Sequence, residues 1–171
     1  MHAFQAKYGY PDYDREFLSM ILEAVRDLRD VQLVVKLHPI EDGEMERELV
    51  EASGMTDVVI TSEGLYELLS ICDVVVTISS TVGVEAAILN RPIIVVNLTR
   101  QPDTMPYVEE GIAVGVYRET DLRDALVRML EENDFRNKLR KSRENFLRRH
   151  VYAVDGKAAS RIADVASVLF Q

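Results

Sequence analysis

The sequence has a single cysteine, Cys72, among its 171 residues, so no disulfide can form within the chain. A chain of this kind fits a reducing compartment. Long apolar runs are also missing: none reaches the roughly 18 residues that predict a membrane-spanning helix. The N-terminus lacks the basic-then-apolar pattern of a secretion signal. Together these absences predict a soluble protein of the cytoplasm.

Positive charge is scarce as well. The chain has 20 Lys and Arg against 29 Asp and Glu, which gives a formal net charge of -9. Broad binding to nucleic acid or to an anionic membrane needs a positive surface, so the composition excludes both as partners. A negatively charged ligand would have to be held locally, by backbone dipoles and a few side chains.

No segment rich in Pro, Gly and Ser divides the chain, and it contains no internal repeat or low-complexity tract. A length of 171 residues is enough for one well-packed domain and short for two. With 47% hydrophobic and 29% charged residues, the composition is typical of a globular protein. We therefore expect one domain over residues 1–171.

Apolar runs of strand length recur along the chain, at residues 31–37, 57–61, 73–78 and 93–98, with a weaker run at 112–117. They are nearly continuous in Val, Leu and Ile, which predicts strands covered on both faces, as in a parallel sheet. Helical patterns lie between them, beginning with an apolar stripe from Phe17 to Leu28. This alternation predicts an α/β fold with a doubly wound, Rossmann-like sheet.

The last third of the chain reads as three further helices, at residues 121–131, 134–149 and 155–170, each opened by an Asp that can cap the first turn. The only strongly basic run, residues 138–150, lies in the second of these. Because the chain as a whole is acidic, a solvated helix face is favoured there over a site for a polyanion.

Three hydroxyl residues, Ser79, Ser80 and Thr81, follow directly after the apolar run at 73–78. Ligands of open parallel sheets bind at the carboxyl ends of the strands, where loops lead into helix N-termini. The segment therefore predicts a site for the phosphate groups of a nucleotide.

The residues that follow support the same interpretation. The backbone amides of Thr81, Val82 and Gly83 would be unpaired donors at the start of the next helix, which attract an anion. Gly83 would let the backbone approach the ligand closely, and Glu85 would accept hydrogen bonds from ribose hydroxyls. The alternative is that the hydroxyl residues only cap the helix and that Gly83 only eases helix packing.

Two other segments are predicted to reach the same edge of the sheet. His38, in the stretch KLHP at the end of the first apolar run, could donate a hydrogen bond to a phosphate or a base. The alternative is a histidine packed at the strand end with a backbone partner. After the run at 93–98, Thr99 and Arg100 lie in a polar loop and could contact phosphate or sugar; an ordinary surface loop is the alternative.

Taken together, these segments resemble the C-terminal half of UDP-N-acetylglucosamine 2-epimerases and related two-domain enzymes of the GT-B fold. The resemblance is carried by VVKLHP (34–39), TISSTVGVEAAILNRPIIVV (77–96), and TRQPD (99–103) followed by YVEEGIAVGV (107–116). It implies that Ser79 and Ser80 contact phosphate, that Glu85 contacts ribose, and that His38 lies near the nucleotide. It covers nearly the whole chain.

The chain departs from the epimerase pattern at several positions, because Ser-Ser-Thr replaces Ser-Gly-Gly and Val84 stands where many epimerases have Glu. The pair formed by His38-Pro39 and Ser-Ser-Thr is also similar to transferases that use nucleotide-activated sugars or CDP-glycerol. In the two-domain family a first domain supplies the acceptor face and most catalytic acids and bases, and an extra strand with a His-Arg element opens the second domain. Residues 1–14 are expected to contain neither the first domain nor that strand. The resemblance thus fixes the type of site more firmly than the base or the reaction.

Three functions follow as hypotheses. The leading one is the nucleotide-sugar-binding half of an enzyme that converts UDP-GlcNAc to UDP-ManNAc by eliminating UDP and adding it back. The alternatives are a glycosyl- or glycerophosphotransferase domain in surface polysaccharide synthesis and a non-catalytic binding domain. No catalytic residue is identified in this chain, and little turnover is expected from it alone.

The expected partners follow from the same hypotheses. They are a UDP-, CDP- or CMP-linked donor and a missing N-terminal domain or partner chain, and a homodimer stays open. No cofactor and no metal are predicted.

Overall fold

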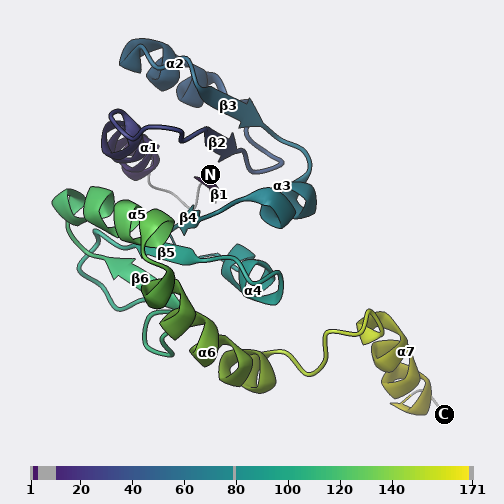
Figure 1. The fold of residues 1–171 in the computed structure, drawn as a ribbon. Helices are drawn as coiled ribbons and strands as arrows, with labels where there is room; N and C mark the ends of the chain where they lie inside the picture. Colours follow the sequence, from purple (N-terminus) through teal and green to yellow (C-terminus); the bar gives the residue numbers. More distant parts are fainter. Residues whose placement is uncertain (1, 4–10, 79, 170–171) are drawn as a thin grey trace.

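A computed structural model describes residues 2–3, 11–78 and 80–169 of the chain. It contains six short strands, all pairing in parallel, and helices that connect and cover them (Figure 1). The strands are β1 (His2–Ala3), β2 (Leu33–Lys36), β3 (Val58–Thr61), β4 (Val75–Thr77), β5 (Ile93–Val96) and β6 (Ala113–Val116). The predicted α/β fold with a parallel, Rossmann-like sheet is confirmed.

The strands form two hydrogen-bonded groups, β1-β2-β3 and β4-β5-β6. Because β1 lies next to β4, the order across the molecule is β3-β2-β1-β4-β5-β6. This is the strand order of a dinucleotide-binding fold, which places ligands at the carboxyl ends of the strands beside the point where the order reverses. That point falls between β1 and β4.

The expectation that residues 1–14 contain no strand is wrong. His2 and Ala3 form β1 and pair with Val35 and Lys36 of β2. Two residues are too few to show any periodicity in the sequence, so only the pairing with β2 identifies them as a strand.

The helices are α1 (Pro11–Val25), α2 (Glu44–Ser53), α3 (Leu65–Ile71), α4 (Val82–Ile88), α5 (Leu122–Glu131), α6 (Asn133–His150) and α7 (Ala158–Leu169), with a 3-10 turn, η1 (Glu119–Asp121), before α5. The predicted Asp caps do not form at the last three helices. Asp121 caps nothing because its carboxylate is bonded to Arg118, and α6 begins before Asp134. Asp155 accepts the Lys157 amide at 3.0 Å, but α7 begins at Ala158, so this bond closes a turn before the helix.

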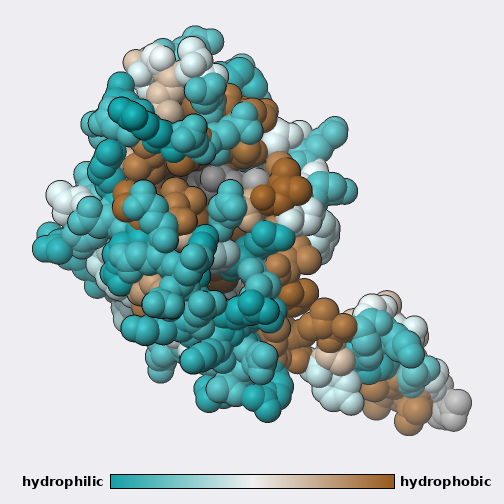
Figure 2. All heavy atoms as spheres, in the orientation of Figure 1, coloured by the Kyte–Doolittle hydropathy of each residue, from teal (hydrophilic) through white to brown (hydrophobic). Residues whose placement is uncertain are grey.

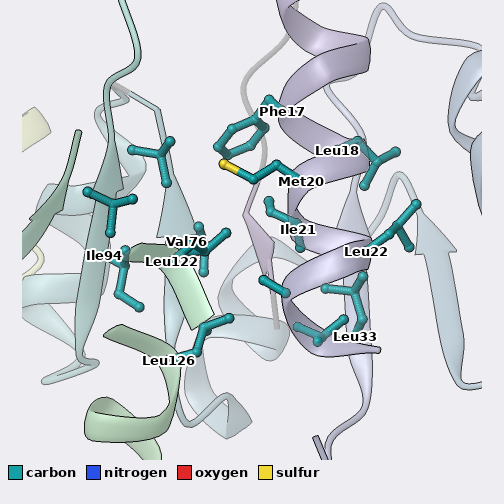
Figure 3. Close-up of a cluster of buried hydrophobic side chains, with 14 of the residues drawn as sticks. Phe17, Leu18, Met20, Ile21, Leu22, Leu33, Val76, Ile94, Leu122 and Leu126 are labelled. Atoms are coloured by element: carbon teal, nitrogen blue, oxygen red, sulfur yellow. The ribbon is translucent and has the colours of Figure 1, made fainter. Parts of the chain in front are cut away.

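Side chains alternate between two apolar clusters along the central strands. Val74, Val76 and Ile94 lie in a cluster with α1 and α5, whereas Val75 and Ile93 lie in a cluster with α3, α4 and α6. Figure 3 shows the first cluster, in which one side of α1 faces the strands. Both faces of the sheet are therefore covered, which is why the strands read as continuous apolar runs.

Helix α7 stands apart from the rest of the molecule and is joined to α6 by an extended segment (Figure 1). Apolar side chains gather on this segment and on α7 (Figure 2). They are exposed: Tyr152, Val154, Ile162, Val165, Val168 and Leu169. Among the described helices, none combines the length and apolar character needed to cross a bilayer.

A pair of identical substitutions tests this division between core and α7. Ile94→Ala should lower the free energy of unfolding by about 2–5 kcal/mol, because Ile94 is fully buried and its loss leaves a cavity. Ile162→Ala, on α7, should change it by no more than about 0.5 kcal/mol, because that side chain is exposed. Urea denaturation measures both, and equal losses would contradict the division.

Candidate functional site

A cavity of about 370 Å³ opens at the carboxyl ends of β2 and β4. Three segments line it: the end of β2, the loop from β3 into α3, and the turn from β4 into α4. The lining residues are Lys36, Leu37, His38, Pro39, Ser62, Gly64, Leu65, Ser80, Thr81 and Val82. We refer to it as the carboxyl-edge pocket. It brings together the two segments that the sequence predicted to share one edge of the sheet.

Ser80 organises the turn that enters α4. Its hydroxyl accepts the Val82 N–H at 3.2 Å, and its carbonyl accepts the Gly83 N–H at 3.0 Å. The expectation that these two amides are unpaired is therefore wrong, because Ser80 already binds both. Thr81 lines the pocket with an exposed side chain that makes no capping bond. Ser79 lies outside the described residues.

Gly83 packs against a buried tyrosine and does not line the pocket. A Cβ built on Gly83 would lie 2.4 Å from Cε2 of Tyr107, a distance that real contacts do not reach. Tyr107 is fully buried, and its hydroxyl donates to the Ser80 carbonyl at 2.8 Å. Burial raises the pKa of Tyr107 to about 12, so this hydroxyl stays protonated as a donor. The glycine is thus explained by packing, the alternative that the sequence left open.

His38 lies in the wall of the pocket and is half-buried. Its Nδ1 accepts the Ile40 N–H at 3.4 Å, and its own backbone N–H donates to Glu41 Oε2 at 2.6 Å. Because Nδ1 acts as an acceptor, a neutral imidazole carries its proton on Nε2. This arrangement leaves His38 with an Nε2–H donor.

Lys36 is the functional candidate that the sequence reasoning missed. It ends β2, lines the pocket, and is only 9% exposed. Its Nζ donates to the Leu37 carbonyl at 2.6 Å. Desolvation by burial lowers the pKa of Lys36, and the negative charge of Glu41 partly opposes this. A lysine at the end of an apolar buried strand was the available signal.

Glu85 does not line the pocket. Its Oε1 accepts a hydrogen bond from Tyr66 at 3.2 Å, which ties α4 to the first turn of α3. The charge of Glu85 raises the pKa of Tyr66. A ribose role for Glu85 stays a prediction.

Thr99 and Arg100 also lie outside the lining of the pocket. The Thr99 hydroxyl donates to Asn97 Oδ1 at 2.6 Å, and Asn97 Nδ2 donates to Asp103 at 2.7 Å. Arg100 has a left-handed backbone with φ of 60°. These bonds form a turn that uses Thr99 for its own structure, and no described contact joins the turn to the pocket.

Within the described part of the chain, no group of three or more His, Cys, Asp or Glu residues is placed to hold a metal ion. The polar groups that the pocket offers are an ammonium, an imidazole donor and hydroxyls. These are the groups that bind an oxyanion such as phosphate.

Comparison with known proteins gives a family and a fold. A family model described as CDP-Glycerol:Poly(glycerophosphate) glycerophosphotransferase matches residues 8–167. A lipid-A-disaccharide synthase of Geobacter sulfurreducens is 33% identical over 86 residues, which are 47% of this chain and 22% of that protein. The chain thus corresponds to less than a quarter of this relative's length.

Solved structures show the same fold at low sequence identity. The UDP-GlcNAc 2-epimerase of Neisseria meningitidis, bound to UDP-GlcNAc, is 15% identical with a TM-score of 0.61, over 86% of this chain and 42% of that one. The C-terminal domain of a group 1 glycosyl transferase, LpcC, of Francisella tularensis is 15% identical with a TM-score of 0.63, over 90% and 86%. The resemblance to a GT-B C-terminal domain is thereby confirmed.

The packing of Gly83 can be tested by a double-mutant cycle. Gly83→Ala should lower the free energy of unfolding by about 1–3 kcal/mol, because the new methyl group collides with Tyr107. In a Tyr107→Leu background the same change should cost less, because the ring is gone. Denaturant titration of the four proteins gives the coupling, and a zero coupling would contradict the contact.

Proposed function

Because this chain belongs to the CDP-glycerol:poly(glycerophosphate) glycerophosphotransferase family, we propose that its carboxyl-edge pocket binds the diphosphate of an activated glycerol donor of the CDP type. One observation carries this proposal: Lys36 and His38 from the end of β2 share a single pocket with Ser80 from the end of β4. On this proposal, the described fold acts as one nucleotide-binding domain.

The chemistry assigned to the pocket is stabilisation of a leaving group. A hydroxyl oxygen of the acceptor attacks the phosphorus that carries glycerol and loses its proton to a base on the acceptor side, and the bond from that phosphorus to the bridging oxygen breaks, which releases CMP. Negative charge then grows on the released phosphate. The Lys36 ammonium and the Nε2–H of His38, both held in position by the protein, would stabilise this charge. Such electrostatic stabilisation by positioned groups contributes most to such steps.

The epimerase hypothesis uses the same pocket with UDP as the leaving group, and the fold alone does not choose between the two reactions. Epimerases and transferases both appear among the structural neighbours, all at low identity. The family match favours the transferase. Nucleotide preference separates them, because the transferase requires a cytosine nucleotide. No binding of any nucleotide would favour the third hypothesis, a non-catalytic binding or interaction domain.

We further infer that the acceptor side and the remaining catalytic groups come from another domain or partner chain. The solved epimerase structure is more than twice as long as the part that this chain matches, which is 42% of it. The apolar side chains of α7 support the inference, because four of them are more than 60% exposed: Ile162, Val165, Val168 and Leu169.

Nucleotide titration tests the proposal. CDP should bind more tightly than UDP by calorimetry, and Lys36→Met should weaken CDP binding more than tenfold, because a charge-assisted hydrogen bond contributes about 1.5–3 kcal/mol. Lys157→Met is the matched control, since Lys157 is exposed and lies outside the pocket. Equal CDP affinity in the two variants would reject the role of Lys36, and no heat with any nucleotide would reject the proposal.

The lowered pKa of Lys36 gives a separate pH test. Deprotonation of Lys36 removes its attraction for phosphate, so CDP affinity should fall in alkaline buffer at a pH below the ordinary lysine value of 10.5. Lys36→Met should abolish this fall.

Without nucleotide, the sign for stability is opposite. The folded state binds fewer protons than the unfolded state between the lowered pKa and 10.5, so stability should rise with pH across that window. For the affinity test, a pH profile of CDP binding in Lys36→Met that matches the wild-type profile would contradict the role of Lys36.

A further inference from the structure

A second cavity, of about 190 Å³, lies at the opposite edge of the sheet. It is bounded by the loop before β5, by the starts of β5 and β6, and by one side of α6. Because β5 begins at Ile93, which lines this cavity, it faces the amino ends of the strands. The carboxyl-edge pocket lies at their other ends. The two cavities are therefore separate sites.

Four arginines line this cavity: Arg91, Arg136, Arg140 and Arg143. We call it the arginine pocket. Its other lining residues are Ala87, Asn90, Pro92, Ile93, Ile112, Asn137 and Leu139, so none of the described lining residues is acidic. The chain as a whole has a net charge of -9, so four guanidinium groups around one cavity without a carboxylate in its lining are an unusual local concentration of positive charge.

None of these arginines forms an ion pair with a carboxylate among the described residues. Arg91 is held by carbonyl oxygens instead, donating to Cys72 at 3.1 Å and to Ser70. Arg143 donates to the Ala87 carbonyl at 3.0 Å. Two guanidinium groups are thus fixed in place by neutral acceptors, and neither has a carboxylate within ion-pair distance among the described residues.

The same two arginines keep unused donors. The Nε atoms of Arg91 and of Arg143 are buried and have no hydrogen-bond partner in the described structure. A buried N–H donor of a charged group without an acceptor is costly. Because these Nε atoms are buried, an oxyanion in the pocket would not reach them and would act instead as countercharge for all four guanidinium groups.

We propose that the arginine pocket binds a phosphate group. The planar guanidinium fork matches the oxygen atoms of phosphate, and several forks around one cavity are the usual way in which proteins hold such an anion. The site is independent of the nucleotide proposal, since it lies at the other edge of the sheet and shares no lining residue with the carboxyl-edge pocket.

The phosphate can have two sources: a free ion, or one phosphodiester of a longer glycerophosphate chain. Next to the arginine pocket, and sharing Asn137 and Arg140 with it, lies an open groove lined also by Lys138 and Lys141, together with Asp134 and Glu144. This groove gives a longer phosphodiester room to extend along α6. The shared chemistry is a phosphate oxyanion, and the experiment distinguishes the sources.

The test is calorimetric titration of the whole chain with inorganic pyrophosphate. All proteins in this test carry Lys36→Met in addition, so that the carboxyl-edge pocket takes up little of the probe. Arg136→Gln with Arg140→Gln should weaken binding at least tenfold. Among the described residues, the side chain of Arg136 bonds within its own helix, to Asn133, so the pair should leave the fold intact. Arg29→Gln with Arg148→Gln is the control, with the same loss of charge at exposed positions outside the pocket.

A short glycerophosphate oligomer, titrated in the same way, identifies the source. Tighter binding than pyrophosphate, lost in Arg136→Gln/Arg140→Gln, assigns the site to a phosphodiester chain, whereas equal or weaker binding assigns it to a free ion. No binding of either probe, or equal binding in the two double variants, overturns the proposal. If the first pair unfolds by circular dichroism, Arg140→Glu alone replaces it.

The outcome of this test does not depend on whether the nucleotide proposal is right. If CDP does not bind, that proposal fails. The comparison of the two double variants still decides the arginine pocket, because Arg136 and Arg140 do not line the carboxyl-edge pocket.

Discussion

Three hydrogen bonds that converge on Ser80 determine the shape of the carboxyl-edge pocket. The Ser80 hydroxyl accepts the Val82 amide, and its carbonyl accepts both the Gly83 amide and the hydroxyl of Tyr107. These bonds fix the turn between β4 and α4. They also hold the start of α4 in contact with the buried ring of Tyr107, so a side chain at position 83 would collide with that ring. The amides of Val82 and Gly83 are bonded to Ser80 and are not free to bind an anion. The attraction for an anion therefore has to come mainly from Lys36 and His38 at the end of β2.

The net charge of the molecule does not determine where an anion binds, because electrostatic interactions in salt solution act over short distances. At physiological ionic strength the Debye length is about 8 Å, so the net charge of -9 does not prevent anion binding where positive groups are concentrated. The structure concentrates them at two opposite edges of one sheet: a buried lysine at the carboxyl edge, and four arginines without carboxylate partners at the amino edge. On our proposals, one edge holds the donor nucleotide and the other holds a second phosphate.

Strands and helices could be predicted from the sequence because the central strands are buried on both faces and leave continuous runs of Val, Leu and Ile. The convergence of His38 and Ser80 followed from the rule that ligands bind at the carboxyl edge of a parallel sheet. Other features escaped prediction for physical reasons. Strand β1 has only two residues, and its existence depends on pairing with β2. Lys36 was missed at the end of an apolar strand, where its side chain lines the pocket. Packing of Gly83 was one of two stated alternatives, but its partner Tyr107 lies 24 positions further along the chain and could not be identified. The arginine pocket combines Arg91 with side chains of a distant helix, where the basic run suggested only a solvated face.

The most direct test of the central claim is a crystal structure of this chain grown with CDP. The account predicts the diphosphate in the carboxyl-edge pocket, with a phosphate oxygen within hydrogen-bond distance of Lys36 Nζ and another facing Nε2 of His38. A nucleotide bound elsewhere on the chain, or a pocket that stays empty at saturating CDP, would contradict it.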